Sequence, residues 1–154
     1  MSFSFDWVLI NEIGLGKSPK TINDINFLKE NNFRSVLSLC GEKEGDIFSG
    51  IAEQFDYINF VLPDHNLKTT MKVEDFDSAI KHLSKLMINK AVYVHCVASV
   101  ERSPLVCMAW LIKYHNLNTI EALEYLKQIH KETNPLPSQL KVLNQFYKIS
   151  RKMK

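Results

Sequence analysis

The sequence predicts an α/β protein with a mainly parallel central sheet flanked by helices. Short apolar segments typical of buried strands alternate with longer segments whose apolar residues recur at three- and four-residue intervals. Strands that alternate with helices in this way usually pair in parallel and are covered on both faces. The length of 154 residues fits one domain, and we expect that domain to span 1–154.

Four short, mainly apolar segments are predicted to form the strands. Two of them end at clear strand breakers, since Cys40-Gly41 follows one and Pro63 follows another. The predicted strands are Trp7–Ile10, Ser35–Leu39, Tyr57–Leu62 and Ala91–Val94. In a parallel sheet, ligands bind beyond the carboxyl ends of the strands, so the loops after Leu39, Leu62 and Val94 are the places to look for a site.

The helices are predicted from apolar spacing and from capping residues. Thr21 with Asp24 three residues later is typical of a helix start, and this first helix is expected to end near Asn31. Asn118 with Glu121 has the same pattern. The remaining predicted helices are Met71–Asn89, Pro104–Tyr114, Thr119–Lys131 and Leu136–Ile149, and residues 42–50 are expected to form a loop or a short helix.

Composition excludes several classes of protein. A net charge of +2 is too small to indicate a nucleic-acid-binding protein, although it suits an anionic substrate. Three cysteines do not form a disulfide framework, and no run of 18 apolar residues exists to span a membrane. We therefore expect a cytoplasmic, monomeric protein without a transmembrane segment.

One loop carries specific chemistry. The predicted strand Ala91–Val94 is followed by His95-Cys96, and five residues later by Arg102-Ser103-Pro104 at the start of a helix. A helix N-terminus offers unpaired N–H groups and the positive end of a dipole, and arginine binds two phosphate oxygens with its planar guanidinium. The positive charge of the arginine and of the helix N-terminus also favours a thiolate at Cys96. A thiolate below a bound phosphate is a nucleophile for phosphoryl transfer.

This arrangement resembles the Cys-x5-Arg signature of the protein tyrosine phosphatases, and the short chain is similar to their compact dual-specificity branch. Ile13-Gly14-Leu15-Gly16 resembles an early segment of that branch, and Asn134-Pro135-Leu136 resembles the start of its last helix. The resemblance implies the compact dual-specificity phosphatase fold. It also implies a hydrolase of phosphomonoesters that needs no cofactor and no metal.

The resemblance assigns roles to the loop residues. Cys96 attacks phosphorus and forms a phosphocysteine, while the Arg102 side chain holds phosphate oxygens. His95 organises the loop by hydrogen bonding, and the Ser103 hydroxyl bonds to the thiolate. The backbone N–H groups that bind phosphate belong to Val97, Ala98, Ser99, Val100, Glu101 and Arg102. The structural alternatives are a buried thiol for Cys96, a surface ion pair with Glu101 for Arg102, a core histidine for His95 and a helix cap for Ser103.

Phosphoryl transfer also needs an acid for the leaving oxygen. Asp64 follows Pro63 on the loop after the third predicted strand, and the family keeps its acid on this loop. The string Asp64-His65-Asn66 also resembles the acid loop of the phosphatase-and-tensin type of lipid phosphatase. The alternative is that Asp64 caps a turn. Asp56, Asp75 and Asp77 are weaker candidates because they start a strand or lie on the long helix.

The sequence departs from the family pattern at two loop positions. Ser99 stands where the family usually has glycine, which allows a tight turn with free φ. Glu101 places a negative charge beside the expected phosphate. These departures leave open a phosphate-binding pseudophosphatase, the alternative from another functional class, whereas a phosphoinositide or phospholipid-head-group phosphatase is the alternative among enzymes.

The two other cysteines have different expected roles. Cys40 ends the second predicted strand, and some members of the regenerating-liver type have a cysteine at the corresponding place that pairs with the nucleophile under oxidation. Cys40 is thus a possible redox partner of Cys96, with a buried core position as the alternative. Cys107 lies in an apolar helix and is expected in the core.

Two further motifs are rejected. Gly14-Leu15-Gly16-Lys17-Ser18 is similar to the end of a nucleotide-binding P-loop, but the pattern requires glycine where the chain has Asn11. A zinc site is disfavoured because no Cys-x2-Cys pair exists. The resemblance therefore implies a dual-specificity protein phosphatase whose substrate is a phosphorylated protein or a small phosphomonoester.

Overall fold

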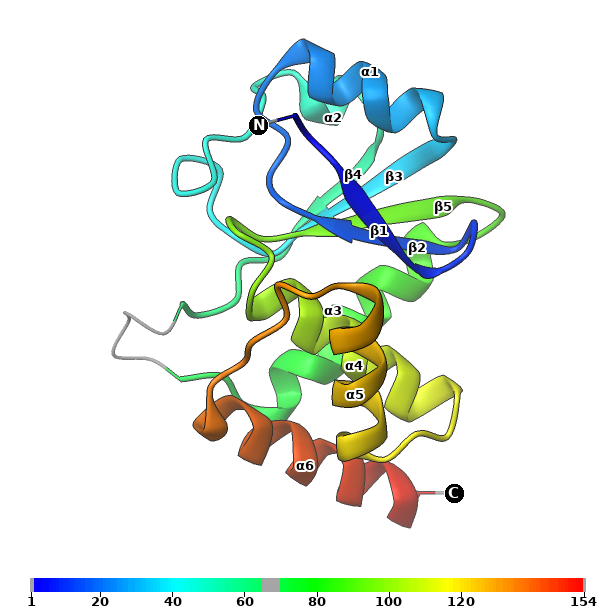
Figure 1. Ribbon diagram of the computed structural model, residues 1–154, viewed down its shortest axis with the longest axis vertical. Helices are drawn as coiled ribbons and strands as arrows, with labels where there is room; N and C mark the ends of the chain where they lie inside the picture. Colours follow the sequence, from blue (N-terminus) through cyan, green and yellow to red (C-terminus); the bar gives the residue numbers. More distant parts are fainter. Residues whose placement is uncertain (1, 65–69, 154) are drawn as a thin grey trace.

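The computed structural model of the protein describes residues 2–64 and 70–153. Within these residues the strands form a five-stranded sheet of order β1-β2-β5-β3-β4 (Figure 1). The strands are β1 (Phe5–Leu9), β2 (Ile13–Gly16), β3 (Phe33–Ser38), β4 (Asp56–Asn59) and β5 (Ala91–His95). All neighbours pair in parallel except β1 and β2, which are antiparallel. The predicted mainly parallel sheet is therefore confirmed.

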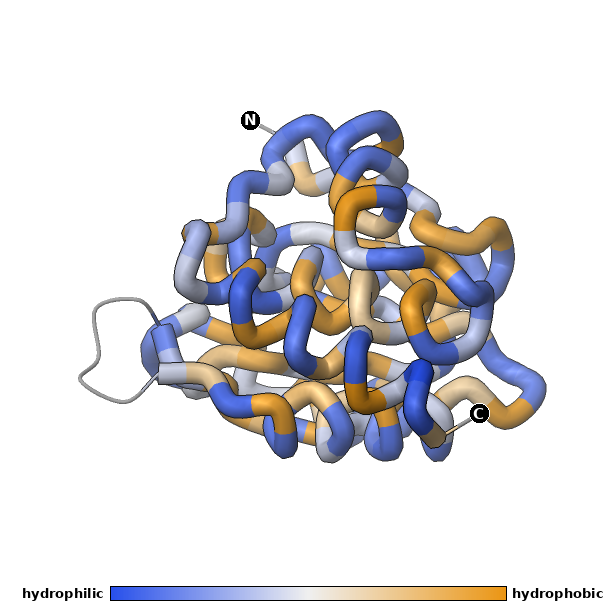
Figure 2. Tube along the Cα trace, turned by 90° about the horizontal axis from the view of Figure 1, so that it is seen from below, coloured by the Kyte–Doolittle hydropathy of each residue, from blue (hydrophilic) through white to orange (hydrophobic). Residues whose placement is uncertain are grey.

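Helices cover both faces of this sheet, as predicted. They are α1 (Ile22–Glu30), α2 (Ile51–Gln54), α3 (Val73–Leu86), α4 (Arg102–Tyr114), α5 (Thr119–Ile129) and α6 (Pro137–Lys152). Helices α1 and α2 lie over one face, and α3 to α6 form a layer on the other (Figure 1). Hydrophobic and hydrophilic residues alternate along the helices, as expected where one helix face is buried (Figure 2). The predicted capping boxes at Thr21 and Asn118 are both formed.

Strand β2 was not predicted, because two of its four residues are glycines. These glycines make room for aromatic rings: a Cβ at Gly14 would overlap the ring of Phe33, and one at Gly16 would overlap the hydroxyl of Tyr93. The segment forms a strand because β1 and β5 supply hydrogen-bonding partners on both sides. Since Gly14 and Gly16 belong to a strand, they do not form a nucleotide-binding loop.

Strand β4 ends at Asn59, three residues before the predicted end. The chain nevertheless continues alongside β3, because the Phe60 N–H donates to the Ser38 carbonyl (2.9 Å) and the Leu62 N–H donates to the Leu39 carbonyl (3.0 Å). This extension carries Asp64 to the edge of the sheet where β3 and β5 also end.

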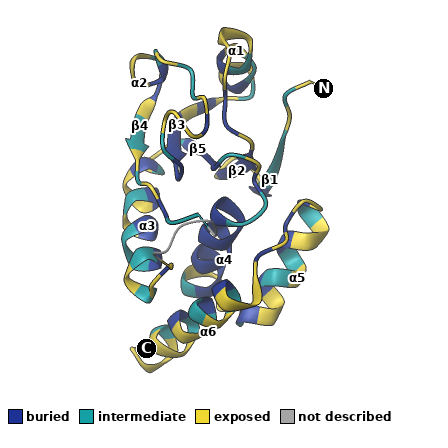
Figure 3. Cartoon of the chain, turned by 90° about the vertical axis from the view of Figure 1, so that its left-hand side faces the viewer, coloured by how far each residue is buried: buried dark blue, intermediate teal, exposed yellow. Residues whose placement is uncertain are grey.

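Helix α4 lies at the centre of the layer that α3 to α6 form on one face of the sheet. Eleven of its residues, from Arg102 to Ile112, are buried, and α3, α5 and α6 surround it (Figure 3). The core position predicted for Cys107 is confirmed, since its side chain is fully buried there. Because α4 starts directly beyond the carboxyl end of β5, its N-terminus points into the edge where the three predicted loops meet.

Candidate active site

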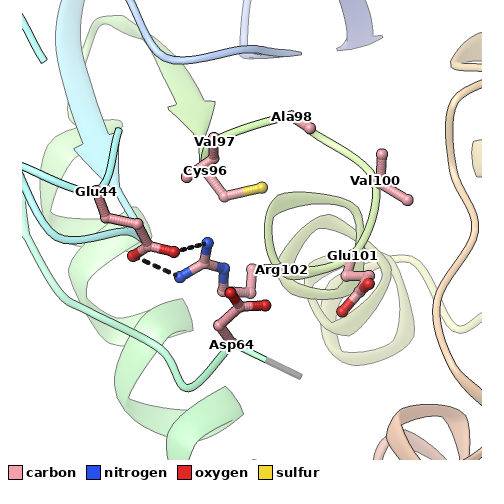
Figure 4. A pocket seen from close by; sticks show the side chains of 8 residues that line it. All are labelled: Glu44, Asp64, Cys96, Val97, Ala98, Val100, Glu101 and Arg102. Carbon is pink, nitrogen blue, oxygen red and sulfur yellow. Dashed lines mark hydrogen bonds and ion pairs between the residues drawn. The ribbon is translucent and has the colours of Figure 1, made fainter. Parts of the chain in front are cut away.

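The loop between β5 and α4 forms one wall of a cavity of about 330 Å³. Residues from three loops line it, which agrees with the position expected for a site in a parallel sheet. The lining residues are Glu44, Asp64, Cys96, Val97, Ala98, Val100, Glu101 and Arg102 (Figure 4). His95, Ser99 and Ser103 lie behind this surface as fully or almost fully buried residues.

Cys96 is buried to 3% exposure, and its sulfur points into the cavity (Figure 4). Its Sγ lies 3.2 Å from Oγ of Ser103, and that hydroxyl lies 3.2 Å from Oγ of Ser99. Ser103 belongs to the first turn of α4, where unpaired N–H groups favour negative charge. The Cys96 sulfur thus lies beside a hydroxyl group that can donate to it and beside the N-terminal end of a helix.

Arg102 is held by a carboxylate that the sequence reasoning did not single out. Its Nη1 and Nη2 donate to Oε1 and Oε2 of Glu44 at 3.2 and 2.7 Å, and Nη1 also donates to the Leu62 carbonyl at 3.3 Å. The two dashed lines in Figure 4 mark the paired contact. Glu44 lies on the loop after Leu39, one of the three loops expected at the site, so loop position was the signal that pointed towards it.

Electrostatics keep both members of this pair charged. Burial by itself lowers the pKa of Arg102, but the hydrogen bonds to Glu44 and the negative charges of Cys96, Glu44 and Asp64 raise it overall. The hydrogen bonds from Arg102 lower the pKa of Glu44, against the opposing effect of burial. The guanidinium is therefore fixed in place before any phosphate arrives, and its charge faces the sulfur.

Four carbonyl groups of the loop Cys96–Glu101 are bound by groups that do not line the cavity. The four donors come from three places in the chain: His95 Nδ1 to Cys96 (3.0 Å), Ser18 N to Val97 (3.3 Å), and, from the segment after α5, His130 Nε2 to Ser99 (2.7 Å) and Asn134 N to Val100 (2.9 Å). In a trans peptide the N–H points opposite to the carbonyl. The N–H groups that follow these carbonyls are thus directed to the cavity side, where an anion would bind.

His95 is a buried neutral histidine. Burial is the main cause that lowers its pKa to about 4. A carbonyl only accepts, so Nδ1 carries the proton that is donated to Cys96, and Nε2 accepts from the Ser38 hydroxyl at 2.5 Å. The ring is therefore held between the Ser38 hydroxyl and the carbonyl that begins the loop.

The two departures from the family pattern have structural explanations. Ser99 has a φ of 60°, a left-handed conformation that costs a non-glycine residue about 1 kcal/mol. The carboxylate of Glu101 lines the cavity and accepts a hydrogen bond from Gln139 Nε2 at 2.9 Å. Glu101 is thus held from the side of α6 while its charge faces the site.

Asp64 lies at the mouth of the cavity, with its carboxylate on the same side as Arg102 (Figure 4). It is half-buried, and its negative charge contributes to the raised pKa of Arg102. His65 and Asn66, which completed the predicted acid-loop string, lie outside the described residues. Asp56, Asp75 and Asp77 do not line the cavity.

Cys40 is fully buried beside the loop. It follows β3, which pairs with the β5 strand that leads to Cys96, and the Leu39 N–H donates to the His95 carbonyl at 2.9 Å. Burial raises the pKa of Cys40 to about 12, opposed by the charge of Arg102 and assisted by that of Cys96. The structure therefore brings Cys40 within electrostatic reach of Cys96 as a protonated thiol.

One group of potential metal ligands occurs on the outer side of the loop. Asp6, His130 and Glu132 place ligand atoms within 4.8 Å of one another. Nδ1 of His130 lies 2.6 Å from Oδ2 of Asp6 and 3.4 Å from Oε2 of Glu132. The sequence reasoning missed this group, because its members come from β1 and from the segment after α5.

Among the helices of residues 2–64 and 70–153, none has the length and apolar character of a membrane-spanning segment.

Comparison with known proteins gives one consistent family. The chain is 25% identical over 144 residues to phosphatidylglycerophosphate phosphatase PTPMT2 of Arabidopsis thaliana, covering 93% of this chain and 63% of that protein. It is 39% identical over 70 residues to phosphatidylglycerophosphatase and protein-tyrosine phosphatase 1 of Rattus norvegicus, covering 46% of this chain and 35% of that protein. The chain thus spans less than two thirds of the length of these relatives.

Solved structures agree on the fold. The crystal structure of PTPMT1 in complex with PI(5)P superposes with a TM-score of 0.83 at 22% identity and covers 97% of each chain. The model of the dual specificity phosphatase catalytic domain matches residues 15–149, a range that includes every residue lining the cavity. By its sequence, its fold and the loop that ends β5, the chain belongs to the family of dual specificity phosphatase catalytic domains.

Proposed function

We propose that this chain hydrolyses phosphomonoesters through a phosphocysteine intermediate on Cys96. One observation carries the proposal: a single cavity holds the Cys96 sulfur, the Arg102 guanidinium and the Asp64 carboxylate, and four of the loop carbonyls are bound by groups outside it. In this arrangement a nucleophile, an anion-binding wall and an acid all face one small volume.

In the first step, the thiolate of Cys96 attacks the phosphorus of a bound phosphomonoester. The inward N–H groups and Arg102 hold the non-bridging oxygens, so catalysis rests on positioning and on charge stabilisation. The S–P bond forms as the P–O bond to the alcohol breaks. Asp64, in its protonated form, donates its proton to the leaving oxygen.

In the second step, water hydrolyses the phosphocysteine. Asp64, now ionised, accepts a proton from the water as its oxygen attacks phosphorus. The S–P bond breaks, inorganic phosphate is released and the thiolate re-forms. Ser103 stabilises this thiolate as a leaving group, because its hydroxyl lies 3.2 Å from the sulfur.

The main substrate class that we propose is a phosphorylated protein, as in the dual-specificity branch. A second candidate is a phospholipid head group, favoured by two of the similar proteins, which are phosphatidylglycerophosphate phosphatases by name. The acidic side chains Glu101 and Asp64 line the cavity, and they repel further negative groups on a substrate. They therefore favour substrates whose negative charge lies mainly on the phosphate. We expect the enzyme to act as a monomer in the cytoplasm.

Turnover of para-nitrophenyl phosphate by the purified chain tests the reaction. Turnover that Cys96→Ser abolishes supports it, and a wild-type protein that binds phosphate without turnover would instead be a pseudophosphatase. A phosphopeptide panel, compared with vesicles containing phosphatidylglycerophosphate or phosphoinositides, then separates the two substrate classes by kcat/KM.

We also propose Cys40 as the thiol that resolves oxidised Cys96. Peroxide converts a thiolate to a sulfenic acid, and attack by Cys40 on that sulfur would form a disulfide and release water. The raised pKa of Cys40 predicts that this step is slow, since the thiolate is the attacking form. A Cys40–Cys96 peptide pair in unreduced digests supports the pairing. If Cys40→Ser recovers from peroxide as well as the wild type does, Cys40 is only a core residue.

A further inference from the structure

Ser99 adopts a backbone conformation that a serine disfavours. Its φ of 60° lies in the left-handed region, and its side chain is buried to 1% exposure. Within the loop Cys96–Glu101, no other residue has a positive φ. The surroundings must therefore hold this residue in place for the loop to keep its shape.

The main restraint on Ser99 is a buried histidine at the C-terminal end of α5. Nε2 of His130 lies 2.7 Å from the Ser99 carbonyl, and the His130 side chain is only 5% exposed. Because a carbonyl and a carboxylate both only accept, both ring nitrogens donate: Nε2 to this carbonyl and Nδ1 to Oδ2 of Asp6. The next carbonyl, that of Val100, is held by the Asn134 N–H at 2.9 Å, so the peptides on both sides of this turn are fixed from the same segment.

Asp6 fixes the orientation of this histidine. Its Oδ2 lies 2.6 Å from Nδ1 of His130, with Glu132 further away at 3.4 Å. A ring that faces a carboxylate on one side and a carbonyl on the other has a single favourable orientation. A carboxylate on strand β1, 90 or more positions earlier in the chain than the loop, thus acts on the loop through one imidazole.

The position of Ser99 also affects the nucleophile. Its hydroxyl lies 3.2 Å from the Ser103 hydroxyl, which in turn lies 3.2 Å from the Cys96 sulfur. If the peptide at Ser99 turned to a right-handed conformation, the N–H of Val100 would leave the cavity side and this row of hydroxyl groups would be broken.

From these contacts we infer that the Asp6–His130 pair is a positioning device that compensates for serine at a left-handed loop position. It holds the Ser99 carbonyl outward and thereby keeps the following N–H directed at the phosphate. The inference deepens the proposed function, since it concerns the loop that would bind the substrate. His130 and Asp6 are positioning residues, because neither lines the cavity that holds Cys96.

A double-mutant cycle tests this role. His130→Ala should weaken inorganic phosphate binding and lower kcat/KM by roughly tenfold, the size of effect expected when a residue in direct contact with the loop is lost. Adding Ser99→Gly removes the left-handed penalty and should restore about fivefold of that loss. Ser99→Ala keeps the Cβ and loses only the hydroxyl, so it should restore nothing.

Matched controls separate positioning from general stability. His115 is an exposed histidine that ends α4 just as His130 ends α5, so His115→Ala should leave phosphate binding and turnover unchanged. His130→Gln keeps a donor near the position of Nε2 and should retain most of the activity. Asp6→Asn should fall between the wild type and His130→Ala. If His130→Ala does not fold, His130→Gln is compared instead with His130→Asn and His130→Ser. Of these three side chains, only glutamine is long enough to place a donor at the Ser99 carbonyl.

Phosphate binding, measured by calorimetry in the Cys96→Ser background, keeps this test independent of turnover. A protein that binds phosphate but does not hydrolyse esters would overturn the proposed function and still test the positioning role. An equal effect of Ser99→Gly with and without His130 would overturn the positioning role. So would phosphate binding that requires Zn²⁺ or is lost with EDTA, because the three side chains would then be holding a metal rather than a hydrogen bond.

Discussion

The two sides of the loop Cys96–Glu101 are built from different parts of the chain. The inner side presents Cys96 and the N–H groups, and Arg102 and Ser103 follow within the next two residues of the sequence. The outer side is held by Ser18, by His95, and by His130 and Asn134 together, which come from three separate segments. Chemistry is thus local in the sequence, whereas the shape of the loop depends on tertiary contacts.

This comparison predicts different results for substitutions on the two sides. Changes on the inner side should remove activity and leave the fold intact. Changes on the outer side should alter stability and phosphate binding together, because they release the loop from its supports.

The largest expected effect is that of Cys96→Ser on the inner side. A serine hydroxyl is a far weaker nucleophile than a thiolate, so turnover should fall by more than about 10⁴-fold. Phosphate binding by calorimetry and the thermal unfolding midpoint should stay close to those of the wild type. Turnover within tenfold of the wild type would rule out the covalent mechanism.

Asp64→Asn should give the next largest effect, and its size should depend on the leaving group. A general acid contributes roughly 10²–10⁴-fold, but a good leaving group needs little protonation. We expect a loss of about 100-fold or more on alkyl phosphates and a much smaller loss on para-nitrophenyl phosphate. Asp77→Asn, on helix α3 outside the cavity, is the matched control. Equal losses on both substrates would indicate that Asp64 is structural.

On the outer side, His95 should make the free energy of unfolding depend on pH. Folding lowers its pKa from 6.5 to about 4, so the unfolded chain binds the extra proton between these values. Stability is therefore complete above pH 6.5 and falls as the pH drops towards 4, by about 3 kcal/mol from this residue. Urea unfolding at several pH values measures this slope.

The variant His95→Asn isolates that contribution. Asparagine keeps a donor near the Cys96 carbonyl but does not titrate, so the variant should be less stable at pH 7 and show a flatter acid slope. Exposed His115→Asn should keep the wild-type slope. An unchanged slope in His95→Asn would mean that other groups cause the acid sensitivity.

Glu44→Gln tests the ion pair that holds Arg102 within the cavity. Arg102 would lose the charge of Glu44 while its side chain stays buried at 6% exposure. We expect kcat/KM to fall by about tenfold, the cost of one lost charge-assisted hydrogen bond. Glu42→Gln, on the same loop but outside the cavity, should have little effect. Full activity in Glu44→Gln would show that the loop fixes Arg102 without this carboxylate.

The same division explains what the sequence predicts and what it does not. The alternation of apolar segments was enough for the sheet and the large helices. Spacing within the loop after β5 was enough for Cys96 and Arg102, and the position of Asp64 after another predicted strand was enough to place it at the same edge. Strand β2 was missed because its two glycines serve the rings of Phe33 and Tyr93, which only the fold brings together. Glu44, Ser38 and His130 were missed for a related reason, since each contacts the site from a segment with no motif of its own.

The smallest expected effect is that of Glu101→Gln, because the Glu101 side chain lines the cavity and is also held by a residue outside the loop. Its carboxylate faces the cavity, yet it is held from outside by Gln139 at 2.9 Å. Removing the negative charge should tighten phosphate binding by a few-fold, because charges near a partly solvated surface interact by about 1 kcal/mol or less. Glu124→Gln removes the same charge from exposed α5 and controls for net charge. The gain should shrink as salt is raised, since screening weakens the repulsion that Glu101 exerts. Weaker binding in Glu101→Gln would show instead that the carboxylate shapes the loop through Gln139, and the residue would then belong with the outer supports.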